Sequence, residues 1–424
     1  GQIQVEISTD IVRESDVIRN VIGLLPGSDP SVRDEVVLLG AHFDHVGARD
    51  DRVFNGADDN ASGTSGVLEL AQAFASADTA PKRSMLFVAF SGEEKGLLGS
   101  RAVVKQGPVD SSKVVFMLNL DMIGRNNKEP VEFVGGDYAT KIRAISESAN
   151  KTLQVPLTFG EYAANSDHHS FFQKEVPVAF FFTGLHDDYH GLADHAEKLD
   201  YQRMEQIVKL GFALTSDVAN AEGVPVFIHK LMWLGASVQR QESKEGFVAK
   251  ITEVEADSRA QSAGLVAGDL IVKIGDSAIE DGMSTISEAE QVSAGSLLRD
   301  VEPGTSVALQ IQRDGNALAI SIERAKRGYL GIFPGAVSDE DRQKYGLAKT
   351  EGLLIGKAVE GAPAFKSGLR DGDIITKLAG HNVNRQSLMK RLSRIGAGET
   401  ITVQAIREGK RIEMPLTLGE PPPR

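Results

Sequence analysis

Four short, uninterrupted apolar runs constrain the fold of this chain more than any other feature of its sequence. The runs are residues 35–40, 84–90, 114–120 and 176–182. Strands that are buried on both faces of a parallel sheet have this composition. Between the runs, apolar side chains recur at helical spacing, as at Val67, Leu70 and Phe74, and again within 139–151 and 201–219. Strands that alternate with helices predict an α/β domain with a mostly parallel sheet.

The length and charge of the chain narrow its class further. A chain of 424 residues is too long for one ordinary core, so we expect two or three domains. A net charge of -13, with no basic stretch, argues against binding to nucleic acid or to anionic membranes. No apolar run approaches the roughly 20 residues that a membrane-spanning helix needs. The absence of cysteine excludes disulfides and thiolate metal sites.

Acidic residues and histidines gather where the apolar runs end. His42 follows the first run, the pair Glu93 and Glu94 follows the second, and Asp121 follows the third. A further acidic pair, Asp58-Asp59, precedes a helical pattern, and the motif 188–194 lies past the fourth run. Because ligands of open parallel sheets collect at the carboxyl ends of the strands, these side chains are expected to converge. Nitrogen and carboxylate donors without cysteine indicate a hydrolytic metal site.

Each cluster also has an ordinary structural interpretation. Asp58 and Asp59 precede Asn60 and Ser62, and all of these residue types cap helices. Glu93-Glu94 taken alone is typical of a solvated turn, and a single histidine such as His42 can be a satisfied buried side chain. The metal interpretation is favoured by the joint pattern, because every cluster ends a core strand or lies just beyond one.

The motifs, in their order, resemble those of the co-catalytic zinc aminopeptidases, a clan that includes glutamate carboxypeptidase II and glutaminyl cyclase. They read His-x-Asp, Gly-Ala-Asp-Asp-x-Ala-Ser-Gly, Glu-Glu-x-Gly-Leu-x-Gly-Ser, Asn-x-Asp-Met and Tyr-His-x-x-x-Asp. The resemblance covers residues 1 to about 220, which we take as a peptidase domain ending at residue 222. It implies an α/β fold with helices on a mixed, mostly parallel sheet, and two zinc ions per chain.

The resemblance also implies a role for individual residues. The implied ligands are His42, Asp59 and Asp121 for one zinc, and Asp59, Glu94 and His190 for the other. Asp59 would bridge the two ions, Glu93 would be the general base, and Asp44 would hold the second imidazole nitrogen of His42. Asp58 is left with a structural role.

The residue types suit this chemistry independently. Paired zinc ions lower the pKa of a shared water and clamp the oxygens of a tetrahedral intermediate. A neighbouring glutamate takes the proton from that water and delivers it to the departing amine. Because adjacent side chains such as those of Glu93 and Glu94 point in different directions, one can ligate while the other transfers protons.

Several further residues lie near these motifs. A tyrosine at a similar place in the family suggests that Tyr162 donates to the developing oxyanion, although this chain has one extra residue between Tyr162 and Ser166-Asp167-His168. We expect Asp167 and His168 to shape the site. The remaining nearby histidines are expected on the surface or behind the ligands; they are His45, His169, His186 and His195.

The C-terminal half contains an internal repeat that follows a linker at 222–225. The segment 263–273 recurs as 367–377, and both share Gly-Leu-x-x-Gly-Asp followed by two aliphatic residues and a lysine. The first copy carries about ten extra residues within 277–300. The repeats resemble PDZ domains of the kind appended to bacterial proteases, over 227–326 and 327–419. The tail, 420–424, is expected to be disordered.

This resemblance implies that each small β-rich domain binds an extended peptide by its carboxyl terminus. Such a peptide joins a sheet edge, and backbone N–H groups of one loop hold its carboxylate. The loop residues would be Leu234 and Gly235 in the first copy, and Leu330, Gly331 and Ile332 in the second, which is closer to the family pattern. Glycine-containing turns are common, however, and a PDZ domain can also serve as a spacer.

We therefore expect a zinc metalloexopeptidase that removes the N-terminal residue of peptides, with PDZ modules that recruit substrate or gate access. The alternatives are a dipeptidase or carboxypeptidase, and a PDZ scaffold whose peptidase domain is vestigial. Proteins of this kind are usually exported, which implies a periplasmic or secreted protein. Because the chain begins at Gly1, we expect that a segment upstream of it has been removed.

Overall fold

The structure is a computed structural model that divides the chain into two compact units, Gly1–Phe227 and Ile228–Arg424. It describes residues 17–160, 162–231, 233–243, 246–275, 277–278, 298, 301–348, 351–385 and 387–422. Each unit has hydrophobic cores of its own. No helix within these ranges is both long and apolar enough to cross a membrane.

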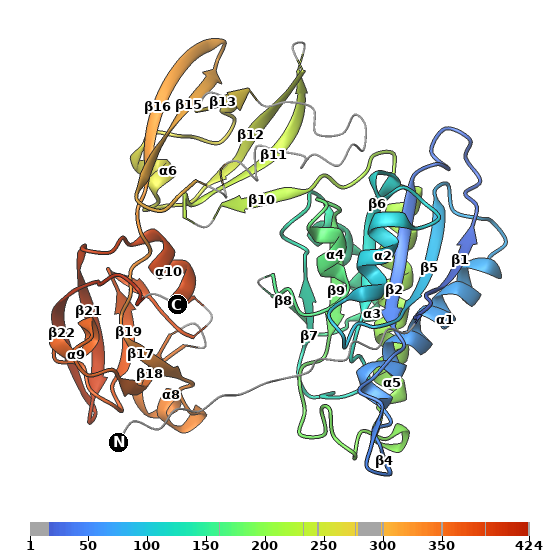
Figure 1. Ribbon diagram of the computed structural model, residues 1–424, viewed down its shortest axis with the longest axis horizontal. Helices are drawn as coiled ribbons and strands as arrows, with labels where there is room; N and C mark the ends of the chain where they lie inside the picture. The colour runs from blue at the N-terminus through green and yellow to red at the C-terminus, as the bar shows by residue number, and fades with distance from the viewer. Residues whose placement is uncertain are drawn as a thin grey trace, which may run out of the picture. The chain divides into compact units, whose positions relative to one another are not determined.

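The N-terminal unit is built on a mixed seven-stranded sheet (Figure 1). In sheet order its strands are β1 (Val21–Leu25), β5 (Ser84–Phe90), β2 (Val36–His42), β6 (Val114–Leu120), β9 (Val178–Phe182), β7 (Val131–Val134) and β8 (Leu157–Gly160). The four apolar runs are β2, β5, β6 and β9, which are neighbours and parallel. The predicted α/β class is therefore confirmed, with β1 and β7 running antiparallel to their neighbours β5 and β9.

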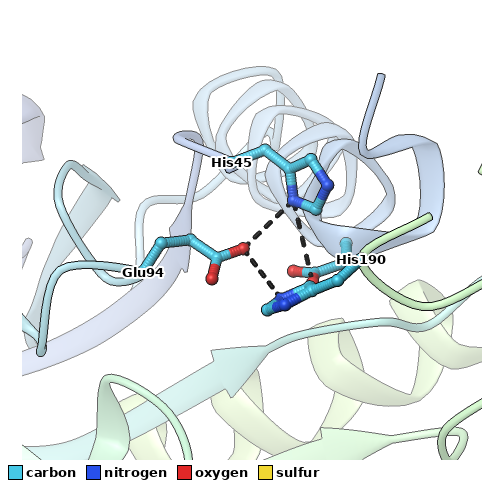
Figure 2. Close-up of side chains that lie close together, drawn as sticks. His45, Glu94 and His190 are labelled. Carbon is cyan, nitrogen blue, oxygen red and sulfur yellow. Dashed lines mark ion pairs between the residues drawn. The ribbon is translucent and has the colours of Figure 1, made fainter. Parts of the chain in front are cut away.

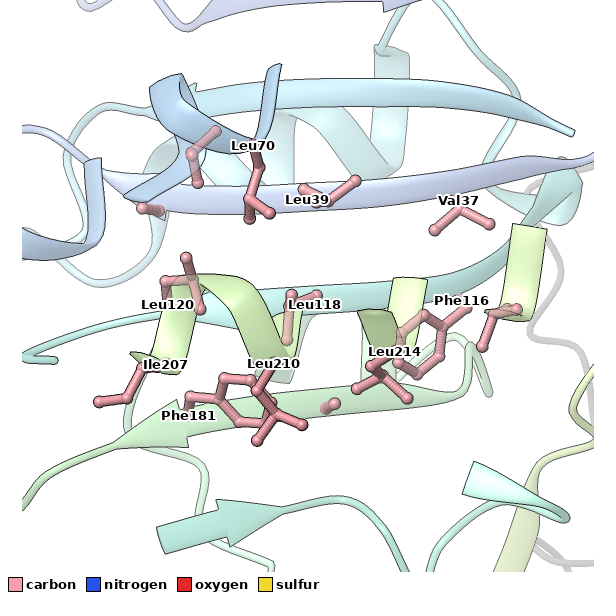
Figure 3. Packing of buried hydrophobic residues seen from close by; sticks show 14 of the residues in the cluster. Val37, Leu39, Leu70, Phe116, Leu118, Leu120, Phe181, Ile207, Leu210 and Leu214 are labelled. Carbon is pink, nitrogen blue, oxygen red and sulfur yellow. The ribbon is translucent and has the colours of Figure 1, made fainter. Parts of the chain in front are cut away.

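Helices cover both faces of this sheet, which explains why its central strands are apolar throughout. In β2, Val37 and Leu39 join the core that also contains residues of α1 (Gly63–Ala75), α3 (Ile142–Leu153) and α5 (Tyr201–Asn220). Val36 and Leu38 point to the opposite core, next to α2 (Leu98–Gln106) and α4 (His168–Phe172). Figure 3 shows the first core, where leucines of α5 lie against the side chains of β2 and β6.

Short elements complete the unit and form its loops. They are β3 (Ala48–Arg49), β4 (Arg52–Val53), η1 (Ala57–Ser62), η2 (Ser111–Lys113) and η3 (Ala196–Lys198). Helix α5 begins where the Asp200 side chain accepts a hydrogen bond from the Arg203 N–H, at 2.9 Å. An apolar stripe on α5 then packs on the sheet.

The N-terminal unit extends beyond the predicted linker. Val226 exchanges hydrogen bonds with Thr140, and Phe227 pairs with Ala139. The Phe227 ring also packs 4.8 Å from the Phe172 ring. Residues up to 227 therefore belong to the first unit, five residues past the expected boundary, because they cover the loop that precedes α3.

The C-terminal unit contains two antiparallel sheets of similar strand order. The first comprises β10 (Ile228–Leu231), β11 (Ala236–Ser243), β12 (Gly246–Val254), β13 (Leu270–Ile274), β14 (Ser277–Ala278), β15 (Thr305–Arg313) and β16 (Asn316–Arg324), with α6 (Arg259–Ser262). The second comprises β17 (Ile332–Gly335), β18 (Leu353–Ala358), β19 (Ile374–Leu378), β20 (His381–Asn382), β21 (Thr400–Arg407) and β22 (Lys410–Thr417), with α8 (Asp339–Tyr345), α9 (Pro363–Lys366) and α10 (Leu388–Arg394).

The sequence repeat corresponds to the same buried ion pair in both sheets. Asp269 accepts two hydrogen bonds from the Arg313 guanidinium, at 2.6 and 2.7 Å. Asp373 accepts two from Arg407, at 2.8 and 2.7 Å. Both aspartates are fully buried, so each needs its bidentate arginine. The Gly-Asp of the repeat and the arginine, which follows 44 residues later in the first copy and 34 in the second, therefore form one structural element.

Two of the predictions concern segments that the structure describes only in part. The extra residues of the first copy, within 277–300, fall outside the described residues except for 277–278 and 298. Of the tail expected to be disordered, residues 423–424 are outside the description, whereas Glu420 forms an ion pair with Lys326 at 3.0 Å. The chain is thus attached to the second sheet as far as residue 420.

Candidate metal centre

Polar side chains of the N-terminal unit meet where β2, β5 and β6 end. His42 is the last residue of β2, Glu94 lies in the turn after β5, and Asp121 directly follows β6. Asp59 comes from η1, and His190 comes from the segment between β9 and α5. Two groups of these side chains place donor atoms within 4.8 Å of one another.

The first group contains His42, Asp59 and Asp121, which are all buried. Nε2 of His42 lies 3.4 Å from Oδ1 of Asp59 and 3.4 Å from Oδ1 of Asp121. Nδ1 of His42 lies 3.1 Å from the main-chain oxygen of Asp44. Because a carbonyl oxygen only accepts, Nδ1 carries the proton, and the lone pair of Nε2 faces the two carboxylates.

The second group contains Asp59, Glu94 and His190, together with His45. Nε2 of His190 lies 3.0 Å from Oδ2 of Asp59 and 3.1 Å from Oε1 of Glu94. Figure 2 shows that the side chains of His45, Glu94 and His190 point toward a common position. His45 was expected on the surface or behind the ligands; the structure instead places it in this group, because the chain turns back after β2.

Asp59 is shared by the two groups, one carboxylate oxygen to each. Its Oδ1 faces His42, and its Oδ2 faces His190. Ligand atoms around a tetrahedral zinc with bonds of 2.0–2.1 Å are roughly 3.3–3.4 Å apart. The distances of 3.0–3.4 Å between these donor atoms match that spacing. The donor sets therefore fit two divalent ions joined by one bridging carboxylate.

The electrostatics of the cluster also favour cations. Burial, followed by the nearby charge of Asp121, raises the pKa of Asp59 to about 7. Within the described part of the chain, Oδ1 of Asp121 and Oε1 of Glu94 are buried without a hydrogen-bond donor. Several carboxylates are buried close together here. A cation among them would offset both the cost of burying their charges and their mutual repulsion.

The loop that carries Asp59 is held by Asp194, which is fully buried. The Asp194 carboxylate accepts hydrogen bonds from the backbone N–H groups of Asp58 and Asp59, at 3.0 and 3.1 Å. The Asp58 side chain turns elsewhere: it accepts from the Gly124 N–H at 2.7 Å and lies 3.2 Å from His186. Asp58 thus supports the loop, while Asp59 faces both groups.

The support of Asp121 comes from the segment expected to shape the site. Ser166 donates a hydrogen bond from its hydroxyl to Oδ2 of Asp121 at 2.7 Å, and Asn119 donates to that hydroxyl at 2.8 Å. Only Oδ1 of Asp121 is left to face His42. His168 is fully buried and stacks on Phe180, so it lies in neither donor group.

Asp44 lies at the second imidazole nitrogen of His42, where it was expected, but its main-chain oxygen makes the hydrogen bond. Its carboxylate lies 3.8 Å from Nδ1 of His42, which is bound by the Asp44 main-chain oxygen instead. The carboxylate accepts hydrogen bonds from the backbone N–H groups of Glu93 and Glu94, at 3.1 and 3.3 Å. Asp44 therefore positions the Glu93-Glu94 turn, because the strand end brings its side chain to that turn.

The two adjacent glutamates face different groups, as expected from their positions in one turn. Glu94 interacts with His45 and His190, which help to lower its pKa against the effect of burial. Burial raises the pKa of Glu93 to about 8; the His42 charge opposes this, whereas Asp121 adds to it. Glu93 thus interacts with the first donor group without being one of its members.

Two tyrosines are candidates for a role at the cluster. The sequence indicated Tyr162, and the structure adds Tyr189. The Tyr162 hydroxyl lies 2.5 Å from Nδ1 of His169, and its ring stacks on Phe172. Tyr189 instead stacks on His190, with ring centroids 3.9 Å apart. Burial, then the charges of Asp59 and Glu94, raises the pKa of Tyr189 to about 12. Its position immediately before His190 was the signal that sequence reasoning missed.

The remaining nearby histidines contact other partners. His169 pairs with Tyr162, and His186 with Asp58. Nδ1 of His195 lies 2.7 Å from the side-chain amide of Asn55. None of these three joins the donor groups found among the described residues.

Comparison with known proteins assigns the N-terminal unit and the second module of the C-terminal unit. Residues 20–215 match the profile of Peptidase family M28. The N-terminal unit belongs to this family. Residues 328–418 match the profile of the PDZ domain, so the M28 unit is followed by a PDZ domain.

Two peptidase relatives are similar to part of this chain. Leupeptin-inactivating enzyme 1 of Streptomyces exfoliatus is 36% identical over 183 residues, which are 42% of this chain and 38% of that protein. A probable leucine aminopeptidase of Arthroderma otae is 30% identical over 237 residues, 48% of this chain and 65% of that protein. The chain thus spans less than two thirds of the length of each.

A third relative belongs to another class of protease. A probable periplasmic serine endoprotease, DegP-like, of Chlamydia trachomatis is 35% identical over 104 residues. The match covers 24% of this chain and 21% of that protein.

Proposed function

We propose that the M28 unit is a zinc-dependent aminopeptidase that hydrolyses the N-terminal peptide bond of peptides. The observation that carries this proposal is the Asp59 carboxylate, whose two oxygens face two separate groups of nitrogen and oxygen donors. No donor of the expected set is missing from these groups, which argues against a vestigial peptidase. The relative named as a probable leucine aminopeptidase supports the same class of reaction.

The proposed ligands of one zinc are His42, Asp59 and Asp121, and those of the other include Asp59, Glu94 and His190. When bound, such a pair of ions supplies an activated water near neutral pH and stabilises negative charge on the substrate carbonyl. Nitrogen and carboxylate donors in this ratio suit zinc. Asp194 accepts a hydrogen bond from the backbone N–H of Asp59, and Ser166 donates one to the Asp121 carboxylate, so the donor groups are formed in advance.

Glu93 is proposed as the general base. Its carboxyl group interacts electrostatically with His42 and Asp121 of the first donor group, and there it can accept the proton of the attacking water and return it to the departing amine. Asp44 holds the backbone of this turn, so Glu93 and Glu94 keep their separate orientations.

Tyr189 is proposed as the hydrogen-bond donor to the developing oxyanion. Stacking on His190 fixes its ring beside the cluster, and its raised pKa keeps the hydroxyl protonated. The role first expected of Tyr162 is given to Tyr189, because the Tyr162 hydroxyl is engaged with His169.

Hydrolysis of a panel of aminoacyl chromogenic substrates tests the proposal. We expect cleavage that is lost on chelation and recovered when zinc is restored. The same panel with blocked N-termini serves as the control, because an aminopeptidase requires a free amino group. Cleavage of blocked peptides, or of C-terminal residues, would instead support the dipeptidase or carboxypeptidase alternatives. Absence of cleavage with zinc bound would contradict the proposal.

We further propose that the C-terminal unit contains two PDZ modules, of which the second binds peptide carboxyl termini. Within the described ranges, its edge strand β17 pairs with β18 alone. Among the described residues, no backbone hydrogen bond outside the strands is donated by the N–H of Leu330 or Gly331. These groups and the strand edge are what a terminal carboxylate and an added strand require.

The equivalent position of the first module is filled by the chain itself. Strand β10 pairs along β11, with Leu231 opposite Ala236. The N–H groups of Leu234 and Gly235 both donate to the main-chain oxygen of Leu231, at 3.0 and 2.8 Å. We therefore assign no peptide-binding role to Leu234 and Gly235.

We also propose that the protein acts in the periplasm or outside the cell. The support is the likeness to a protease named as periplasmic. Fractionation of the producing cells tests this placement, with a cytoplasmic enzyme as the marker for leakage. Recovery of the protein with that marker would contradict it.

A further inference from the structure

His45 occupies a place in the second donor group that the set of ligands proposed above does not explain. Its Nδ1 lies 3.1 Å from Oε1 of Glu94 and 3.7 Å from Oδ2 of Asp59. The side chain is only 9% exposed. Neither ring nitrogen makes a hydrogen bond within the described part of the chain. A buried imidazole without such a bond, aimed at two carboxylates, is typical of a metal ligand.

The surrounding backbone is shaped around this ring. Gly56 has a left-handed conformation, with φ of 63°. A Cβ at that position would lie 2.6 Å from Cγ of His45 and 2.4 Å from the main-chain oxygen of Asp59. The ring also packs edge-on against His190, with centroids 5.5 Å apart. Glycine therefore allows the ring to approach the cluster, and both imidazoles converge on the same carboxylates.

We infer that His45 is a further ligand of the ion held by Asp59, Glu94 and His190, which rests on the proposed two-metal function. Two imidazole nitrogens and two carboxylate oxygens then surround that position, and Figure 2 labels His45, Glu94 and His190 among them. Four protein donors complete a tetrahedral zinc site, as in sites that bind metal for structure.

The two metal positions are consequently unequal. His42, Asp59 and Asp121 provide three protein donors, which leaves one place for water or substrate, as in catalytic zinc sites. The position that includes His45 is closed and binds its ion more tightly. The first ion to bind therefore occupies the closed position, and the exchangeable ion is the one next to Glu93.

Metal affinity distinguishes a ligand from a residue that only supports one. Loss of a residue behind a ligand weakens metal binding by about 10–100-fold. We expect His45→Asn to weaken the tighter of the two zinc-binding steps by more than this. The control is His381→Asn, which removes a histidine of the C-terminal unit that pairs with Asp257. That variant should bind both ions like the wild type.

The experiment is a zinc titration of the full chain against a competing chelator, with unfolding followed in the metal-free state to confirm that each variant folds. Two unequal steps for the wild type, and loss of the tight step in His45→Asn alone, support the inference. Equal steps, or a loss of 100-fold or less, overturn it while leaving the two-metal proposal intact. A wild-type chain that binds no zinc overturns the proposed function as well.

X-ray absorption of the wild-type chain with one equivalent of zinc provides a test that needs no variant. The inference predicts two imidazole nitrogens and two carboxylate oxygens around the single ion. One imidazole would overturn it, even if His45→Asn failed to fold.

Discussion

At the scale of single residues, the site depends on the separate orientation of side chains that are neighbours in the sequence. Asp58 faces Gly124 and His186, whereas Asp59 faces both donor groups. Glu93 and Glu94 also have different partners. Glu93 interacts with His42, and Glu94 interacts with His45 and His190. Substitution can therefore remove one function of each pair while its neighbour remains in place.

Glu93→Gln is expected to lower kcat by at least 10²–10⁴-fold and to leave metal binding unchanged. The amide cannot accept a proton, and Glu93 is not among the donor groups. Steady-state rates and metal content of the same preparation check this. Glu94→Gln is the matched comparison and should lose metal. Activity retained by Glu93→Gln would remove the residue from the role of base.

Tyr189→Phe is expected to lower kcat by about 10²–10³-fold with little change in KM, because it removes one oxyanion donor. Phenylalanine keeps the stacking on His190, so the ligand remains in place. Tyr162→Phe is the control, since its hydroxyl contacts His169. Kinetics of both variants decide the matter, and a larger loss in Tyr162→Phe would return the role to that residue.

At the scale of elements, different sequence features predict the strands of the N-terminal unit and the repeats of the C-terminal unit. Strands β2, β5, β6 and β9 are recognisable because both of their faces are buried. The two repeated modules share a buried aspartate and its arginine, which join β19 to β21 and β13 to β15. Each ion pair fixes the turn before one strand to the end of another.

Arg407→Met is expected to destabilise the second PDZ module by about 2 kcal/mol, because Asp373 would remain buried without its partner. The expected loss is no larger because the Arg407 side chain is 37% exposed, so solvent screens part of its charge. Hydrogen exchange should then be about 30-fold faster across β19 and β21. Arg411→Met, on an exposed position of β22, is the control. Unchanged exchange in Arg407→Met would show that the ion pair contributes little.

At the scale of the whole molecule, one chain combines a unit of Peptidase family M28 with a PDZ domain. Its two modules of similar strand order differ at the edge where a peptide would join. Strand β10 covers β11 in the first, and the edge of β17 has no strand beside it among the described residues. Substrate capture through the C-terminal unit is therefore expected to use one module.

A labelled peptide with a free carboxyl terminus is expected to bind the full chain, and its amidated form is not. Phe333→Asp, on the exposed edge strand β17, should abolish this binding by placing charge where the peptide lies. Gln239→Asp, on β11 of the first module, should leave it unchanged, because β10 already covers that strand. Fluorescence anisotropy of the two variants measures the difference. The opposite pattern would assign the binding to the first module.

The sequence by itself determined the α/β class, the metal-binding chemistry and the repeated modules, because periodicity and residue type report burial and donor chemistry directly. It also indicated most of the polar side chains that the structure brings together, since parallel strands end at one edge of a sheet. Only the tertiary structure decided which loop atoms meet. The paths of loops bring His45 to the second donor group, Asp44 to the Glu93-Glu94 turn and β10 to the edge of β11 in the first module. Those paths depend on contacts between residues far apart in the chain, which no local pattern records.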